Sequence, residues 1–464
     1  MGAPGRFAGR ALSATSPVRR NGIGNGELTE NDGETPVLRW PSLRQPLDVL
    51  FLFCCVLLTA DVLVPEIFGN GKTKDYALWF WAGRQVLTGG DLYKSITNGA
   101  LDFIYPPPPA VMLAIPAWFG KIPLYLGLSI LNSAAWAITS QLSNAMTGSK
   151  KIPAPWLAAL PGFATVTFVF DQYDLGQPNL VLLAMMLLGF WWMQKGRPWL
   201  GGSMFALATA IKMFPVAVLP YLLWRRRWAA SASMVVATLA LLYVMPAPVR
   251  GFERNAAELK TWFSAMVGSS SEKGFGQRDE QNWSWVNQSL IAVTHRLVRP
   301  INYYMDDPRH APEYMNVLDV SYKTANWIVL AVIGLIGLGF ICVIPAYRKM
   351  TERSTAEELG ILFCLMTVAS PLARQYYFMW LFMPLTVLMH RAAFDARPKV
   401  RTGTWTLLGI VGVLMVLSLP VFPAMLQAWG NNLLATALLV GGLIWHMHHA
   451  PPLLDSSEVP ERVA

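Results

Sequence analysis

The sequence predicts an all-α fold, a polytopic transmembrane helical bundle with surface-lying helices in its outer loops. Only 14% of the 464 residues are charged and 54% are hydrophobic, whereas soluble domains carry about 25% charged residues. Apolar runs long enough to cross a bilayer recur along the chain. The net charge of +9 comes from Lys and Arg clustered between these runs, a pattern that indicates membrane topology and no nucleic-acid partner.

Polar segments at both ends border the predicted membrane domain. Residues 1–45 are rich in Gly, Ser, Pro and Arg and predict a disordered cytoplasmic tail. Residues 46–446 form the membrane domain, and residues 447–464 form a C-terminal tail. Roughly eleven to thirteen spans are expected in the domain. They are predicted over residues 47–68, 124–146, 154–170, 179–193, 200–224, 229–245, 327–347, 359–370, 376–390, 405–421 and 433–445.

Two stretches leave the number of spans open. Residues 110–119 are too short to cross the membrane alone and are bounded by prolines. Lys212 and Pro215 interrupt the run 200–224 midway. That run is therefore either one kinked helix or two short half-helices.

The distribution of Lys and Arg assigns the two sides of the membrane. Basic clusters such as 225–227 all lie on the cytoplasmic side if 110–119 does not cross and 200–224 runs there and back. The outer side then receives a first outer loop, 69–105, and a long outer loop, 247–325. We therefore expect a multi-pass protein of the plasma (inner) membrane.

The first outer loop begins with a short amphipathic helix. Its apolar residues recur at helical spacing, and Gly89-Gly90 is expected to end the helix. The apolar stripe consists of Tyr76, Trp79, Phe80, Gly83, Val86 and Leu87. Asp75 stands at the head of this helix. A carboxylate there is either an N-cap, worth about 1 kcal/mol, or a catalytic base, and the two roles are compatible.

Further polar groups are expected on the outer side. The segment 171–179, DQYDLGQPN, is either a solvated turn or part of a site. Lys212 lies among apolar residues, where an unpaired ammonium costs about 2.5–3.5 kcal/mol. It either snorkels to the surface or reaches an anionic head group. Arg374, at a Pro-bent helix end, has the geometry to bind a phosphate through two hydrogen bonds.

One carboxylate near two cations at a membrane surface suits sugar transfer from a lipid phosphate. Such a donor carries its own leaving group, so the protein needs a base for the acceptor hydroxyl and cations for the departing phosphate. Paired carboxylates, which glycoside hydrolases use, have no clear signature here. The four cysteines lie inside apolar runs, and neither a metal nor another cofactor is expected.

Several motifs occur in an order that resembles a known family. The first is D-Y-x4-W-A-G-R-x4-G-G-D-L-Y from Asp75, followed by Y-P-P-x3-V-M-L-x2-P from Tyr105. The others are L-G-Q-P-N-L at 175–180, G-R-P-W-L-G-G at 196–202, A-x-A-I-K-M-F-P at 208–215, W-R-R-R-W at 224–228, N-Q-S-L at 287–290 and S-P at 370–371. Over residues 47–390 the chain resembles the polyprenol-phosphate-mannose-dependent alpha-mannosyltransferases of the GT-C superfamily, which include the mycobacterial enzymes that elongate phosphatidylinositol mannosides.

The resemblance implies roles for the matched polar residues. Asp75 would be the catalytic base, and Lys212 would meet the donor phosphate at an invaginated helix break. The expected substrate-binding residues are Asp91, Tyr93, Gln177, Asn179, Asn287 and Gln288. The chain departs from the family after Pro371, where a His-containing S-W-x-H is expected and Arg374 follows instead. Arg374 either takes over the polar role, at the donor phosphate, or marks a changed acceptor or donor.

The expected function is transfer of a hexose, mannose by resemblance, from a polyprenyl-phosphate donor to a hydroxyl of a lipid or glycan acceptor. Transfer would occur on the outer face with inversion, and the lipid bilayer would hold both substrates. Two alternatives remain: a lipid-linked-sugar flippase or other secondary transporter, and a non-catalytic membrane assembly subunit. In the enzyme Asp75, Lys212 and Arg374 should face one cavity, whereas a scaffold has no reason to bring them together.

Overall fold

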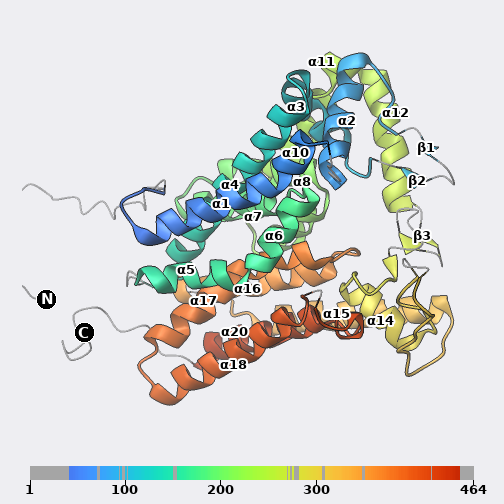
Figure 1. The fold of residues 1–464 in the computed structure, drawn as a ribbon. Coiled ribbons are helices and arrows are strands. Elements are labelled where there is room, and N and C mark those ends of the chain that lie inside the picture. The colour runs from blue at the N-terminus through green and yellow to red at the C-terminus, as the bar shows by residue number, and fades with distance from the viewer. Residues whose placement is uncertain are drawn as a thin grey trace, which may run out of the picture. The chain divides into compact units, whose positions relative to one another are not determined.

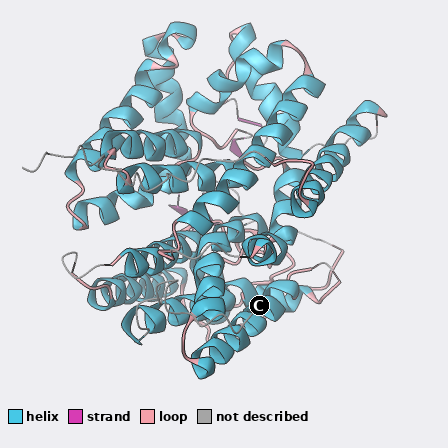
Figure 2. Ribbon diagram, turned by 90° about the vertical axis from the view of Figure 1, so that its left-hand side faces the viewer, coloured by secondary structure: helices cyan, strands magenta, loops and turns pink. Residues whose placement is uncertain are grey.

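The computed structural model is built almost entirely of helices, which confirms the predicted fold class (Figure 2). It describes residues 41–69, 74–93, 95–96, 100–101, 103–149, 154–268, 270–271, 274–275, 282–305, 309–346, 351–419 and 421–449. All of them belong to one compact unit, Leu38–Ala464. The predicted tails lie outside the described residues, apart from 41–45 and 447–449. The described strands form two antiparallel pairs, and each strand has two residues. β1 (Ser95–Ile96) pairs with β2 (Ala100–Leu101), and β3 (Ser270–Ser271) pairs with β4 (Gly274–Phe275).

Five helical segments in the described part of the chain are long and apolar enough to cross a membrane. They are α1 (Pro46–Ile67), α4 (Lys121–Ala145), Trp228–Arg250, α15 (Tyr322–Val343) and α18 (Pro398–Val416). The segment Trp228–Arg250 contains α10 (Trp228–Leu239), η2 (Ala240–Val244) and α11 (Ala247–Arg250). A sixth is possible if α6 (Val166–Leu175) and α7 (Asn179–Gln194), which are bent by 119°, count as one span.

This number is below the eleven to thirteen spans that the apolar runs predict, because several runs are not continuous helices. The run 154–170 is divided at Thr165, between α5 (Pro155–Ala164) and α6. The run 376–390 begins as the 3-10 helix η5 (Gln375–Leu381) before α17 (Phe382–Phe394). Apolar composition indicates which segments are buried in protein or membrane. It does not indicate whether such a segment is one continuous helix.

The two stretches left open by the sequence are resolved as short elements. α3 (Pro107–Trp118) has 12 residues, about 18 Å of helix, against about 30 Å for a bilayer core. The run 200–224 is two half-helices, α8 (Pro198–Ile211) and α9 (Val218–Trp224), with η1 (Phe214–Ala217) between them. Lys212 follows α8 with extended backbone angles, φ −149° and ψ 121°, and therefore lies at the break.

The remaining helices lie in the segments 69–105 and 247–325 and in the C-terminal bundle. The predicted amphipathic helix is α2 (Lys74–Thr88), and Gly89 after it has a φ of +69°, as expected for a glycine that ends a helix. The others are α12 (Phe252–Phe263), η3 (Ser264–Gly268), α14 (Leu290–Val298), α16 (Glu352–Ala369), α19 (Ala424–Ala428) and α20 (Asn431–His449). Helices α16, α17, α18 and α20, orange to red in Figure 1, pack against one another.

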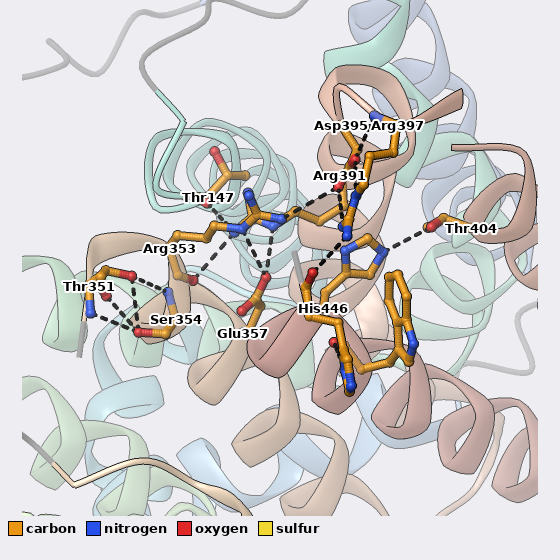
Figure 3. Close-up of polar contacts among 12 residues, drawn as sticks. Thr147, Thr351, Arg353, Ser354, Glu357, Arg391, Asp395, Arg397, Thr404 and His446 are labelled. Carbon is orange, nitrogen blue, oxygen red and sulfur yellow. Dashed lines mark hydrogen bonds and ion pairs between the residues drawn. The ribbon is translucent and has the colours of Figure 1, made fainter. Parts of the chain in front are cut away.

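Buried ion pairs gather at the N-terminal end of α16. Glu357 accepts a hydrogen bond from Arg391 Nε at 2.9 Å and a longer one from Arg353 Nε at 3.5 Å (Figure 3). Arg391 also donates to the Thr147 carbonyl beyond α4, at 3.0 Å. The neighbouring Glu358 pairs with Arg225 at 2.6 Å. These contacts join the ends of α4, α9, α16 and α17, and we refer to this region as the arginine end.

Candidate active site at a helix break

The segment 171–179 forms a sharp turn onto which α2 packs. Gly176 ends α6 with a left-handed φ of +73°. A Cβ atom at this position would lie 2.8 Å from the Tyr76 ring, so the contact requires glycine. Trp79 Nε1 donates a hydrogen bond to the Gly176 carbonyl at 2.8 Å. Tyr76 and Trp79 of the predicted apolar stripe thus face this turn, while Gly83 of the same stripe packs against α3. Asp75, one residue before Tyr76, reaches Gln177.

The Gln177 side chain lies between the predicted base and the predicted cation. Its Nε2 atom donates a hydrogen bond to Asp75 Oδ2. Its Oε1 atom accepts hydrogen bonds from Lys212 Nζ at 3.1 Å and from the Tyr105 hydroxyl at 3.3 Å. Lys212 Nζ also donates to Asn179 Oδ1 at 3.3 Å. The helix breaks at Gly176 and at Lys212 therefore meet at one amide.

Aromatic rings surround the Lys212 ammonium. Its Nζ lies 4.5 Å from the centroid of Tyr377, 5.4 Å from that of Tyr376 and 5.8 Å from that of Tyr105, within the range of cation–π attraction. Among the residues that the structure describes, no carboxylate oxygen lies within 4.0 Å of this ammonium. The Lys212 ammonium does not extend to the membrane surface, because it is bonded to the side chains of Gln177 and Asn179. Its charge is not cancelled by an ion pair in the described chain, and it remains able to attract an anion.

Asn179 adds an unused donor beside the cation. Its side chain is fully buried, and its Nδ2 atom has no hydrogen-bond partner among the described residues. A buried amide donor without a partner costs about 1–3 kcal/mol. A ligand oxygen bound next to Lys212 would remove this cost.

Asp75 lies in the first turn of α2, which begins at Lys74. The predicted N-cap role is wrong, because Asp75 is the second residue of the helix. A carboxylate in the first turn still interacts favourably with the helix dipole, and this is compatible with base chemistry. Burial, followed by the nearby charge of Asp75, raises the pKa of Tyr105 well above its usual range. The Tyr105 hydroxyl therefore stays protonated and acts as a donor to Gln177.

Arg374 lies near the same cluster and acts on it through its charge. It precedes η5, is half-buried, and interacts electrostatically with Tyr376 and Asp171. Tyr376 interacts electrostatically with Asp75 as well. Tyr376 therefore links Arg374 to the cluster, because it interacts electrostatically with both Arg374 and Asp75.

Two predicted substrate-binding residues lie elsewhere. Asp91 follows the far end of α2, about 22 Å along a 15-residue helix from Asp75. There it pairs with Arg254 of α12 at 2.7 Å. Tyr93 is buried and donates its hydroxyl to the Tyr105 carbonyl at 2.7 Å. Asp91 therefore fastens α12 to the first outer loop, and Tyr93 supports Tyr105 from behind.

Asn287 and Gln288 hold the segment that leads to Arg374. Asn287 Nδ2 donates to the Pro371 carbonyl at 2.9 Å, and its Oδ1 accepts from the Ala373 amide at 3.0 Å. The Gln288 backbone N–H donates to the Ala373 carbonyl at 2.9 Å. The Gln288 side-chain oxygen accepts a hydrogen bond from the Asn432 backbone N–H at 3.0 Å. Both side chains are buried and bonded to backbone groups of this structure.

The aromatic residues around Lys212 did not figure among the predicted site residues. Tyr105 belongs to the quoted Y-P-P motif, and Tyr376 and Tyr377 follow directly after Arg374-Gln375. A tyrosine next to a proline-rich stop was the one local signal for Tyr105. No group of three or more His, Cys, Asp or Glu residues able to hold a metal occurs in the described ranges.

Comparison with known proteins identifies a family that matches part of the chain. The family model described as glycosyltransferase family 87 matches residues 103–371. The matched segment contains Tyr105, Gln177, Asn179 and Lys212, begins after Asp75 and ends before Arg374.

Curated relatives match parts of the chain. A polyprenol-phosphate-mannose-dependent alpha-(1-2)-phosphatidylinositol mannoside mannosyltransferase of Mycobacterium tuberculosis is 30% identical over 34% of this chain and 40% of its own length. The similarly named protein of Mycolicibacterium smegmatis is 30% identical over 36% and 42%. A phosphatidylinositol pentamannoside mannosyltransferase of Mycobacterium tuberculosis is 24% identical over 68% and 65%. The chain thus spans about 40–65% of the relatives it matches. Because the family model covers more than half of the sequence, the chain belongs to glycosyltransferase family 87.

Proposed function

We propose that the protein is a membrane glycosyltransferase that moves a hexose, mannose, from a polyprenyl phosphate to a hydroxyl of a lipid or glycan acceptor. The observation that carries this proposal is the contact of Asp75 and Lys212 with the same Gln177 amide in a family 87 chain. A carboxylate and a cation so close together supply the base and the phosphate counter-ion of one reaction. The relatives are named as polyprenol-phosphate-mannose-dependent mannosyltransferases, which supports mannose and a polyprenol-phosphate donor.

In the proposed step the acceptor oxygen forms a bond to the anomeric carbon while its proton passes to the Asp75 carboxylate. The bond between the anomeric carbon and the phosphate oxygen breaks, and polyprenyl phosphate leaves with the electron pair. Attack opposite the leaving group inverts the configuration at the anomeric carbon. The proton on Asp75 is later released to water. No metal is needed for this balance.

Lys212 would neutralise the charge that develops on the leaving phosphate. Its neutral partners leave its positive charge for the donor, and the buried Asn179 Nδ2 would donate a hydrogen bond to a phosphate oxygen. Arg374, which interacts electrostatically with Tyr376, would add a second positive charge near the leaving phosphate. Donors fixed before the reaction stabilise a developing charge without reorganising.

The proposal places the reaction on the outer face of the plasma membrane. The arginine end and the segment 371–373 lie at opposite ends of α16, whose 18 residues extend about 27 Å. Positive residues accumulate on the cytoplasmic side of membrane proteins. With the arginine end in the cytoplasm, the site faces outward, where the bilayer would hold two lipid-linked substrates. The apolar stripe of α2 is mostly buried within the protein and is not available to seat them.

A transporter or a passive assembly subunit is less well supported. In a passive subunit Asp75 would only stabilise the start of α2, and nothing would require Lys212 to reach the same amide. A transporter would need charged groups at mid-membrane in both halves of the chain, whereas of the charged groups in the described site Lys212 is the one at a break between two apolar half-helices.

The test is transfer of radiolabelled mannose from polyprenyl-phosphate mannose to lipid acceptors in membranes. Asp75→Asn keeps the shape of the side chain but cannot accept a proton, so we expect a loss of about 10²-fold or more. Asp319→Asn, at an exposed carboxylate of the long loop, is the matched control and should retain activity. Full activity of Asp75→Asn would overturn the role of Asp75. If the wild type uses another polyprenyl-phosphate sugar instead, the assignment of mannose is wrong and the class of reaction stands.

A further inference from the structure

Gln177, predicted as a substrate-binding residue, bonds to both the proposed base and the proposed cation. Its side chain is 5% exposed and touches Asp75, Lys212 and Tyr105. We propose that Gln177 is a positioning residue that holds Asp75 and Lys212 near each other while keeping them from forming a direct ion pair. This inference rests on the proposed function, because it assumes that Asp75 and Lys212 act on the substrates.

The neighbours of Gln177 determine which way its amide points. Lys212 and Tyr105 bring hydrogen-bond donors, so the amide oxygen must face them. Asp75 brings a carboxylate acceptor, so the amide nitrogen must face it. A reversed amide would place oxygen against carboxylate and nitrogen against ammonium. The side chain is therefore held in one orientation by charge.

A neutral spacer preserves the reactivity of both charged groups. An ammonium bound directly to a carboxylate stabilises the carboxylate anion and makes it a weaker base. The same bond would engage the positive charge that the phosphate needs. Gln177 bonds to both groups and cancels the charge of neither, which suits a site that must bind an anion and remove a proton.

The surrounding backbone fixes the position of the spacer. The left-handed Gly176 precedes Gln177 and packs under the Tyr76 ring, and Pro178 follows it. Tyr105, which bonds to Gln177, is itself held by Tyr93. Because these supports come from three segments of the chain, the amide has little freedom to follow one of its partners.

Asp75, which Gln177 links to Lys212, has several further charged and titratable groups around it. Tyr105, before α3, and Tyr376, in η5, interact with it electrostatically. Lys74, the preceding residue in α2, pairs with Asp174 at the end of α6. Arg374 and Asp171 interact with Tyr376 in turn. These residues remain in every variant below, so a difference between the variants and the wild type reports on position 177.

The first test is Gln177→Glu, which replaces the amide nitrogen by a second carboxylate oxygen facing Asp75. Two carboxylates in contact share a proton. We expect the acid limb of kcat/KM against pH for mannosyl transfer to move to higher pH by about one pH unit or more. A residue that only binds substrate, or only supports the fold, would change KM or protein yield and leave this limb in place.

The second test separates the base from the cation by comparing Gln177→Met with Asn179→Leu. Gln177 contacts both Asp75 and Lys212, whereas Asn179 contacts Lys212. Gln177→Met should lower kcat at least about tenfold and raise the KM for the polyprenyl-phosphate donor. Asn179→Leu should act chiefly on the donor KM and leave the acid limb unmoved. Thermal unfolding of each purified variant in detergent checks that it is folded.

The outcomes distinguish this inference from the proposed function. If Asp75→Asn is inactive but folded Gln177→Glu has an unmoved acid limb and Gln177→Met keeps the wild-type kcat, the positioning role is refuted and the enzyme stands. If Asp75→Asn is fully active, the role proposed for Asp75 fails and the positioning role fails with it.

Discussion

Trp79 donates its indole hydrogen to the Gly176 carbonyl at a distance of 2.8 Å, and this bond fastens the first outer loop to the break between α6 and α7. Both residues are buried. The bond is local in space but joins segments that are far apart in the sequence. It sets the distance from the start of α2 to Gln177, on which the contact with Asp75 depends.

Replacement of Gly176 by alanine should therefore disable the site. A non-glycine residue with left-handed angles costs roughly 1–2 kcal/mol, and the new Cβ would lie 2.8 Å from Tyr76. We expect lower thermal stability together with a loss of mannosyl transfer of about tenfold or more.

Gly196→Ala provides the matched control for this substitution. Gly196 has nearly the same φ, +72°, but nothing lies within 4 Å of a Cβ built on it. Gly196→Ala should therefore lose stability because of the strained backbone angles, but its rate of mannosyl transfer should stay at the wild-type value. Equal transfer rates in the two alanine variants would show that the contact with Tyr76 does not matter.

Lys212→Met should impair phosphate departure. The substitution removes a fixed cation next to the proposed leaving group, and loss of one such donor typically lowers kcat by about 10²–10³-fold. Steady-state kinetics with varied donor concentration measure the effect. Lys212→Arg should retain part of the activity because it keeps the charge, although the guanidinium fits the tyrosine rings differently. A Lys212→Met enzyme with wild-type kcat and donor KM would remove Lys212 from the mechanism.

Glu357→Gln should destabilise the protein without changing the chemistry. Loss of one partner of a buried ion pair costs about 3–5 kcal/mol, because the other charge is left uncompensated, and here that charge is Arg391. Thermal unfolding in detergent should show a clear decrease, while kcat per folded molecule stays near the wild-type value. Glu352→Gln, at an exposed residue of the same helix, should leave the unfolding temperature nearly unchanged.

The long outer loop should lose stability in mild acid because of His295. Burial, followed by the nearby Arg299, lowers the pKa of His295 from 6.5 to about 4. Below pH 6.5 the His295 side chain is protonated in the unfolded chain but stays neutral in the folded protein. The free energy of unfolding therefore falls as the pH decreases from about 6.5 to about 4. Unfolding temperatures measured at pH 7 and pH 5 should differ less in His295→Gln than in the wild type. An equal difference in both proteins would exclude His295 as the cause.

Much of the candidate site could be predicted because its residues lie in short motifs with unusual local chemistry. Lys212 stood out as a charge in an apolar run, and Asp75 as an acid at the head of an amphipathic helix. Gln177 and Asn179 were found through the resemblance, not through their own pattern. Tyr376 and Tyr377 were missed, since a buried aromatic residue near a lysine looks like any other core residue in the sequence.

The sequence by itself determined the membrane class, the helical fold, the amphipathic helix and the glycine that ends it. These properties follow from composition and from neighbours a few residues apart. Only the tertiary structure decided that 200–224 breaks at Lys212, that Asp91 pairs with Arg254 of α12, and that Asn287 and the Gln288 backbone bond to the segment before Arg374. Those outcomes depend on hydrogen bonds between distant segments, such as the one from Asn287 to Pro371, and local sequence patterns carry no information about which distant partners will meet.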